Sequence, residues 1–308
     1  MPDHHGRPSL AGRSLQLLPA IAASIAGVLV GAAMVATRVV VDQTGPASLA
    51  LLRYLIGFAC LLVPVLLTPR APFERRDLLP IALLGIGQFG VLIALLNVGL
   101  RVVPAARAAV IFATVPLLTL LLAAALGRER LTGPKSVGVL LTIAGVALAL
   151  GEKAALRGDA SHAWLGELAV FASALTGAVC SVLYRPYLEK YPTLPVSAFA
   201  MLASVGFLAI LAAGEGFFAA PPYFTVEGWL AVVFIGMSSG VGYYLWLWAL
   251  HHATPTRVTV FLALSPITAA ALGAALLGER IAMLSAVGVV CVVLGLWLAH
   301  WRPAIGDG

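Results

Sequence analysis

Charged residues are scarce in this sequence: Asp, Glu, Lys and Arg make up 10% of its 308 residues, whereas hydrophobic residues make up 61%. A soluble domain carries about 25% charged residues, because water must solvate its surface. The charges here are too few to cover a water-facing surface, so lipid must be the main solvent. We therefore expect a multi-pass protein of the lipid bilayer.

Cysteine is rarer still, and no catalytic or nucleotide-binding constellation is present. The three cysteines lie inside apolar runs with no metal-ligand or disulfide spacing: Cys60, Cys180 and Cys291. Glycines that could suggest a phosphate loop, Gly85, Gly87 and Gly90, also lie in an apolar run and cannot form a Walker motif. We expect no metal, no cofactor and no enzymatic activity, and we read these glycines as helix-packing residues.

The basic residues form short clusters between apolar runs rather than a patch with interleaved aromatics, which argues against nucleic acid as a partner. Loop charges set the orientation of a membrane protein, because cytoplasmic loops carry the excess of Lys and Arg. With the N-terminus inside, twelve basic residues fall on the cytoplasmic side and six outside. We expect both termini in the cytoplasm and the chain in the plasma (bacterial inner) membrane.

Ten apolar runs are long enough for helices that cross a bilayer, which needs about 20 residues. Pro, Gly and charged residues separate them. The expected helices cover 16–38, 47–68, 78–100, 105–127, 134–151, 163–184, 195–214, 228–250, 255–277 and 282–300. The fold class is thus an all-α membrane protein.

The sequence repeats itself after a shift of 150 residues. Glu129-Arg130 aligns with Glu279-Arg280, and Pro116 with Pro266; the shift also aligns Gly90 with Gly240, Gly138 with Gly288, and Gly145 with Gly295. Because each copy holds five helices, the second enters the membrane in the opposite orientation. Two inverted five-helix repeats are a recurrent architecture of secondary transporters.

At this level of detail the sequence resembles the EamA-type transporters of the drug/metabolite transporter superfamily. The resemblance rests on a Pro inside the fourth helix of each unit, on the Gly/Leu-rich runs that end in Glu-Arg, and on Arg53-Tyr54 in the second helix. It implies an N-terminal tail (1–15), a first repeat (16–151), a polar connection (152–162), a second repeat (163–300) and a C-terminal tail (301–308). Departing from the pattern, helix seven has Leu202 and Ala203 where an arginine equivalent to Arg53 would stand.

Arg53 is the one charged residue well inside an apolar run. A central arginine costs about 2.5–3.5 kcal/mol on insertion, so it should face protein or a wet cavity. One interpretation is a contact to an anionic group of the substrate. The other is a structural arginine near the outer helix end that pairs with Asp42 or a backbone carbonyl.

Further substrate-binding candidates lie on helices that line the central cavity in the family. Ser239, Tyr243 and Trp246 share one helical face, although tryptophan is also typical of the membrane boundary. The other candidates are Arg38 on helix one, Gln88 and Asn97 on helix three, and Tyr184 on the face of helix six that also carries Ser173, Gly177 and Cys180.

Pro116, Glu129, Pro266 and Glu279 are interpreted as structural motif residues. A carboxylate at a helix C-terminus opposes the macrodipole. We therefore expect each glutamate to serve the N-terminus of the following helix or to pair with arginine. No carboxylate lies near the centre of an apolar run, so the sequence leaves proton coupling open.

The predicted function is a secondary transporter that moves a small metabolite, amino-acid-like or otherwise amphipathic, by alternating access and in the direction of efflux. An uptake permease of the same fold is the first alternative. A membrane-embedded enzyme would need converging His, Asp or Glu residues, and a structural or sensing protein has no need of an inverted duplication. The oligomeric state, monomer or homodimer, is left open.

Overall fold

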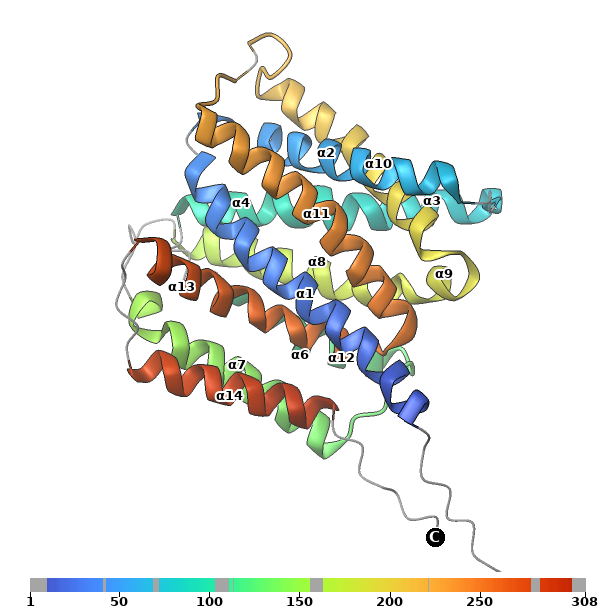
Figure 1. Cartoon of the computed structure of the whole chain (residues 1–308), viewed down its shortest axis with the longest axis vertical. Helices are drawn as coiled ribbons and strands as arrows, with labels where there is room; N and C mark the ends of the chain where they lie inside the picture. The colour runs from blue at the N-terminus through green and yellow to red at the C-terminus, as the bar shows by residue number, and fades with distance from the viewer. Residues whose placement is uncertain are drawn as a thin grey trace, which may run out of the picture.

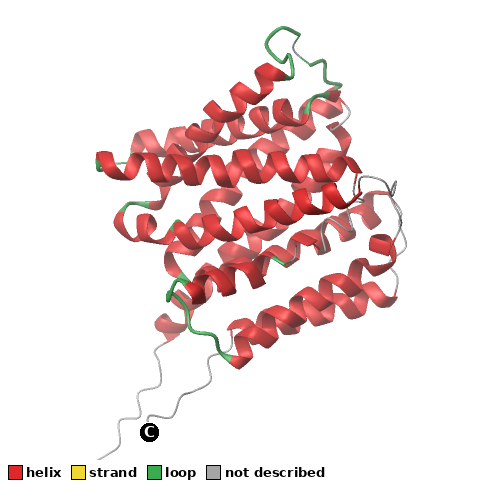
Figure 2. Cartoon of the chain, turned by 180° about the vertical axis from the view of Figure 1, so that it is seen from behind, coloured by secondary structure: helices red, strands yellow, loops and turns green. Residues whose placement is uncertain are grey.

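The computed structural model describes residues 10–40, 43–68, 72–102, 111–112, 114–155, 163–220, 222–277 and 283–300. Within these ranges the chain is helical, with turns between helices and no strand, as Figure 2 shows. The all-α class expected from the sequence is confirmed.

The helices follow one another as antiparallel rods (Figure 1). In the first part of the chain they are α1 (Leu10–Val40), α2 (Pro46–Leu67), α3 (Arg75–Gly85), the π-helical turn η2 (Ile86–Val91), α4 (Leu92–Val102), α6 (Val115–Ala125) and α7 (Gly133–Ala155). In the second they are α8 (Ala163–Leu183), α9 (Arg185–Lys190), α10 (Thr193–Gly214), α11 (Val226–His252), α12 (Pro255–Thr259), the 3-10 turn η3 (Val260–Ala263), α13 (Leu264–Leu277) and α14 (Met283–His300).

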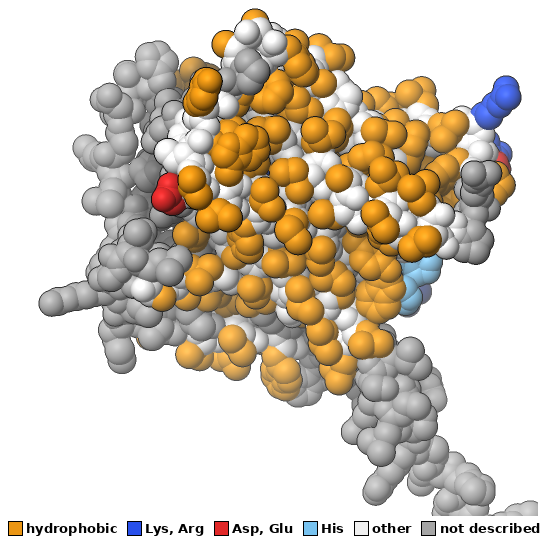
Figure 3. Space-filling model, turned by 45° about the horizontal axis from the view of Figure 1, so that its top comes forward, with side chains coloured by type: hydrophobic (Ala, Val, Ile, Leu, Met, Phe, Trp, Pro, Cys, Tyr) orange, Lys and Arg blue, Asp and Glu red, His pale blue; other side chains and the backbone are white. Residues whose placement is uncertain are grey.

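Six helical segments of the described chain are long and apolar enough to cross a membrane. They cover 17–37, 46–67, 75–99, 164–190, 193–214 and 226–252, and shorter apolar helices accompany them at 115–125, 133–148 and 290–299. The outer surface of the bundle is apolar: Leu67 is 81% exposed and Ile210 is 72% exposed. Figure 3 shows one such face covered by hydrophobic side chains, with the charged side chains at its edges. The chain is a multi-pass membrane protein.

The helix bounds repeat with the same shift as the sequence. Adding 150 to the residue numbers of the helical segment 75–102 gives 225–252, which matches α11 to within one residue. Adding 150 to the first residue of α7 gives the first residue of α14. Helix contacts repeat as well. α1 packs on α11 and α13, while its counterpart α8 packs on α4 and α6; α2 packs on α11, while its counterpart α10 packs on α3 and η2.

Glycine permits the closest of these approaches. α7 and α14 lie side by side along one edge of the bundle (Figure 1), where Gly138 faces Gly295 and Gly145 faces Gly288. A Cβ atom on Gly138 would lie 2.7 Å from the carbonyl oxygen of Gly295, and one on Gly145 would lie 2.7 Å from that of Gly288. These repeated glycines are therefore helix-packing residues.

The same reading holds for Gly85, Gly87 and Gly90. Added Cβ atoms there would meet, respectively, the backbone of Ala200, the sulfur of Cys180 and the ring of Phe207. Small residues let helix backbones approach within a membrane, where dispersion contacts drive association. These three glycines therefore bring the third rod, which is the continuous helical segment 75–102 formed by α3, η2 and α4, against α8 and α10.

Glu129 joins the two parts of the chain at one end of the bundle. Its side chain is 1% exposed, forms an ion pair with Lys135, and accepts a hydrogen bond from the backbone N–H of Thr256 at 3.1 Å. Thr256 stands in the first turn of α12, where backbone N–H groups lack partners within the helix. As expected, Glu129 serves a helix N-terminus, although that helix is α12 and not the next one along the chain; its ion-pair partner Lys135 stands at the start of the following helix α7.

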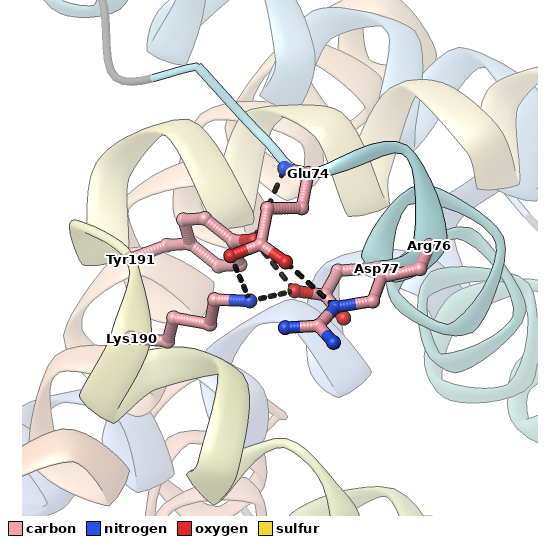
Figure 4. Close-up of polar contacts among 5 residues, drawn as sticks. All are labelled: Glu74, Arg76, Asp77, Lys190 and Tyr191. Carbon is pink, nitrogen blue, oxygen red and sulfur yellow. Dashed lines mark hydrogen bonds and ion pairs between the residues drawn. The ribbon is translucent and has the colours of Figure 1, made fainter.

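A second polar cluster ties α3 to α9 (Figure 4). Asp77 accepts hydrogen bonds from Lys190 and from the Tyr191 hydroxyl, both at 2.6 Å, while Glu74 pairs with Lys190 and with Arg76 at 2.6 Å. The hydrogen bond from Lys190 holds the pKa of the exposed Glu74 carboxyl below its usual value. This cluster fixes the end of the third rod to the segment that connects α8 with α10.

Candidate functional site

A cavity of about 140 Å³ lies inside the bundle, between helices of the first and second parts of the chain. Its wall is formed by α1, α2, η2, α4 and α6 of the first part together with α8, α11, η3 and α13 of the second part. Most of the wall is apolar or aromatic. Concave, mostly apolar sites with a few polar groups are typical of small-molecule binding.

Arg53 is the one charged side chain among the described residues that line this cavity. It extends from α2, half-buried, and its Nε donates a hydrogen bond of 2.5 Å to the Ser239 hydroxyl on α11. Ser239 in turn donates to the carbonyl oxygen of Ile235 at 2.6 Å. This chain of bonds holds the guanidinium group by one edge. Asp42, the partner that the structural alternative named, lies outside the described residues.

Aromatic rings form a row beside Arg53. The guanidinium carbon lies 5.5 Å from the centre of the Tyr54 ring, that ring lies 4.7 Å from Phe89, and Phe89 lies 4.1 Å from Tyr243 in an edge-to-face arrangement. Such pairs stabilise the packing beyond the area they bury. The row connects α2, η2 and α11, and it gives the cavity a rigid aromatic wall.

Gln88 reaches the cavity from the π-helical turn η2. π-turns inside α-helices are rare and frequently mark functional sites. The N–H of Leu92 bonds to the carbonyl oxygen of Gly87, five residues earlier, which closes the wide turn. In the described structure the buried Oε1 atom of Gln88 has no hydrogen-bond partner.

The structure brings five of the eight substrate-binding candidates to this cavity: Arg53, Gln88, Ser239, Tyr243 and Trp246. Tyr184 does not line it, but its ring lies 6.4 Å from that of Tyr243 and its side chain is fully buried. Asn97 is elsewhere, with its amide donating to the carbonyl oxygen of Pro46 at 3.4 Å. The Arg38 side chain lies outside the described residues.

α8, the sixth helix expected from the sequence, contributes less to the cavity than its polar face suggests. Ser173 donates to the carbonyl oxygen of Leu92 at 2.8 Å, and the Cys180 thiol lies 3.7 Å from the carbonyl oxygen of Leu84. Both side chains therefore pack α8 against the third rod. From α8, only Gly177 and Ser181 are among the described lining residues.

Several lining residues were not singled out from the sequence, above all Phe112 and Leu262. Each stands four positions before a repeated proline, Pro116 or Pro266, and the shift of 150 residues relates the two. Their shared position before the repeated prolines is the feature of the sequence that could have identified them. Pro116 is buried in the first turn of α6; the Pro266 side chain and all of Glu279 lie outside the described residues.

Comparison with known proteins agrees with this architecture. The family model described as "EamA-like transporter family" matches residues 17–151 and 164–301. A protein of Streptantibioticus cattleyicolor named "Probable terminal-alkyne amino-acid exporter" is 31% identical over 87% of this chain and 88% of its own. The "Uncharacterized inner membrane transporter YedA" of Escherichia coli K12 is 30% identical over 95% of this chain and 96% of its own.

A solved crystal structure has the same fold, with a TM-score of 0.78 and 25% identity over 94% of this chain and 96% of its own. The family model covers most of the sequence in two stretches, and two relatives at 30% identity or more are named as an exporter and a transporter. The chain belongs to the EamA-like transporter family.

Proposed function

We propose that the protein is a secondary transporter that exports a small amphipathic solute through the bacterial inner membrane by alternating access. The observation that carries the proposal is the position of the cavity, which is lined by helices from both parts of the chain. A solute held there contacts both parts at once. Rocking of one part against the other would then open the cavity to either side.

Two inverted five-helix repeats are part of this proposal. The helix bounds and the helix contacts repeat after 150 residues, and the family model matches one stretch in each part of the chain. With five spans in each repeat, the copies have opposite orientations, and both termini are cytoplasmic. The repeats then exchange conformations between the inward-open and the outward-open state.

The substrate side of the proposal rests on Arg53 and the aromatic wall. A guanidinium group binds carboxylates through paired N–H donors, and the apolar wall suits an apolar side chain. Efflux is supported by the relative whose name says amino-acid exporter. The described lining residues include no Asp, Glu or His, and this composition favours a solute-binding cavity over a catalytic site.

The direct test reconstitutes the purified protein in liposomes and screens labelled metabolites for counterflow. Wild-type protein should exchange at least one carboxylate-bearing solute, while protein-free liposomes should not. Arg53→Gln should reduce that exchange by at least about tenfold, the effect of losing a charged hydrogen bond. Arg75→Gln, which changes an exposed arginine at the start of α3, is the matched control and should exchange normally.

Failure of every solute to exchange, while a positive-control carrier works in the same liposomes, would refute the transport proposal. Retained exchange by Arg53→Gln would assign Arg53 to structure alone. Repeating a positive assay under an imposed pH gradient shows whether a proton moves with the solute.

A further inference from the structure

The amide of Gln88 lines the cavity and has not yet been given a role. Its Oε1 atom is buried and, within the described structure, unpartnered, although buried polar groups are normally hydrogen-bonded. An unmade hydrogen bond at such an atom destabilises the empty site. A solute that brings a donor to this oxygen removes that penalty when it binds.

The hydrogen bond described for Arg53 engages Nε alone, with Ser239. The terminal nitrogens of a guanidinium carry further donors in a planar fork, which matches the geometry of a carboxylate. Serine cannot neutralise the positive charge. A carboxylate in the cavity would provide both the acceptor and the opposite charge.

The two groups face one cavity from adjacent elements. Arg53 and Gln88 both line it, and the rings of their chain neighbours Tyr54 and Phe89, tilted and 4.7 Å apart, link α2 to η2. A volume of about 140 Å³ corresponds to roughly ten water-sized groups at about 10–15 Å³ each. Apolar side chains also line this cavity, among them Leu92, Leu96, Phe112, Val115 and Leu262.

We infer, building on the proposed function, that the solute is a small carboxylate with an amine or a hydroxyl on carbon 2 and a short apolar tail. Arg53 binds the carboxylate, the Gln88 carbonyl accepts from the donor on carbon 2, and the apolar wall covers the tail. Gln88 is thus a specificity-determining residue: it separates 2-amino and 2-hydroxy acids from plain fatty acids of the same size. The donor can be charged or neutral, because the group that receives it is a neutral amide.

Four probes of similar size separate the parts of this inference. Leucine has the carboxylate and the amine, 2-hydroxy-4-methylpentanoate the carboxylate and the hydroxyl, 4-methylpentanoate the carboxylate alone, and leucinamide the amine alone. Binding to the purified full-length protein is measured by tryptophan fluorescence, since Trp246 lines the cavity, and counterflow is measured in parallel. At least one of the first two should bind about tenfold or more tightly than 4-methylpentanoate and leucinamide.

Gln88→Met keeps the length of the side chain and removes the acceptor. In this variant the preference for a donor on carbon 2 should fall from about tenfold to less than about threefold, while the preference for a carboxylate over leucinamide persists. The readout is a ratio between two ligands on one protein sample, so a partly folded preparation does not alter it. Thr176→Val on α8, whose hydroxyl bonds to its own helix at Ala172, is the control and should keep both preferences.

Equal binding of 4-methylpentanoate and of its 2-substituted relatives to the wild type would overturn the inference without any variant. An undiminished preference in Gln88→Met would overturn the assignment to Gln88. If other solutes exchange in the liposome screen but none of the four probes binds, the substrate class is wrong and the transport function stands. Exchange of no solute at all would count against the proposed function itself.

Discussion

The buried carboxylate of Glu129 gives a quantitative test of how the two parts of the chain are held together. Its side chain is 1% exposed and is shared between Lys135, whose side chain is 13% exposed, and the N–H of Thr256 at 3.1 Å. Glu129→Ala removes both contacts. The substitution leaves a buried N–H without an acceptor and a largely buried ammonium group without its counter-charge.

The expected loss follows from those two consequences. An unsatisfied buried N–H costs about 1–3 kcal/mol, and breaking a buried ion pair from one side costs about 3–5 kcal/mol. Because the Lys135 side chain retains some exposure and can turn toward water, we expect about 3 kcal/mol of lost stability for Glu129→Ala. Glu129→Gln keeps an acceptor for Thr256 and should lose only about 1–2 kcal/mol.

The assay is unfolding in mixed micelles with a rising fraction of denaturing detergent, followed by tryptophan fluorescence. Lys135→Met completes a double-mutant cycle. In the background of Lys135→Met the loss caused by Glu129→Gln should shrink by at least about 1 kcal/mol, because the ion pair is already absent. If both substitutions at Glu129 stay within about 0.5 kcal/mol of the wild type, the carboxylate does not join the two parts of the chain as described.

Two further predictions concern helix packing and the exposed cluster at α3. Gly145→Leu should separate α7 from α14 and prevent folding, so that little protein is recovered, because its Cβ would lie 2.7 Å from the Gly288 carbonyl oxygen. Gly206→Leu, with no atom within 4 Å of an added Cβ, should express as the wild type does. Comparable yields of the two variants would refute the close contact. Since its hydrogen bond with Lys190 lowers the folded-state pKa of Glu74, that contact stabilises the protein fully above the usual value of 4.5 and is lost as the pH falls through the lowered pKa. The melting temperatures of the wild type and of Glu74→Gln should differ at neutral pH and converge at acid pH. A difference that stays constant with pH would contradict a stabilising contact between Glu74 and Lys190.

The scaffold could be predicted from the sequence because its signals are local or periodic. Apolar runs identify the helical segments, although only six of those in the described chain are long and apolar enough to cross a membrane. The aligned glycines mark residues that pack helices, but they do not say that α7 pairs with α14. The partner of Arg53 could not be predicted, because Ser239 is 186 positions away in the chain and Asp42 or a carbonyl satisfies the same electrostatic argument. Glu129 presents the same difficulty: the Glu-Arg repeat marks the residue, but only the folded chain shows which helix N-terminus lies beside it.

Gln88 and Asn97 show what helical periodicity could and could not decide. Residues nine positions apart lie about half a turn apart around an α-helix, so a straight helix turns at most one of these amides toward a given cavity. Periodicity does not say which of the two it is. The π-helical turn at Ile86–Val91 contains Gln88, and nothing in a run of apolar residues and glycines distinguishes such a turn from an ordinary α-helix.

The repeat preserves the glycines that pack α7 against α14 and changes several of the residues that line the cavity. Gly138 and Gly145 recur as Gly288 and Gly295, and each faces the other's copy across α7 and α14. The cavity residues have unlike counterparts 150 positions away: Arg53 with Ala203, Gln88 with Ser238, Ile93 with Tyr243, and Leu96 with Trp246. A small metabolite with a carboxylate at one end and an apolar tail at the other has no two-fold symmetry, so a site with identical halves would leave one of them mismatched. Under the proposed mechanism, the equal packing would let each part adopt the other's conformation, while the unequal lining would hold the solute in a single orientation.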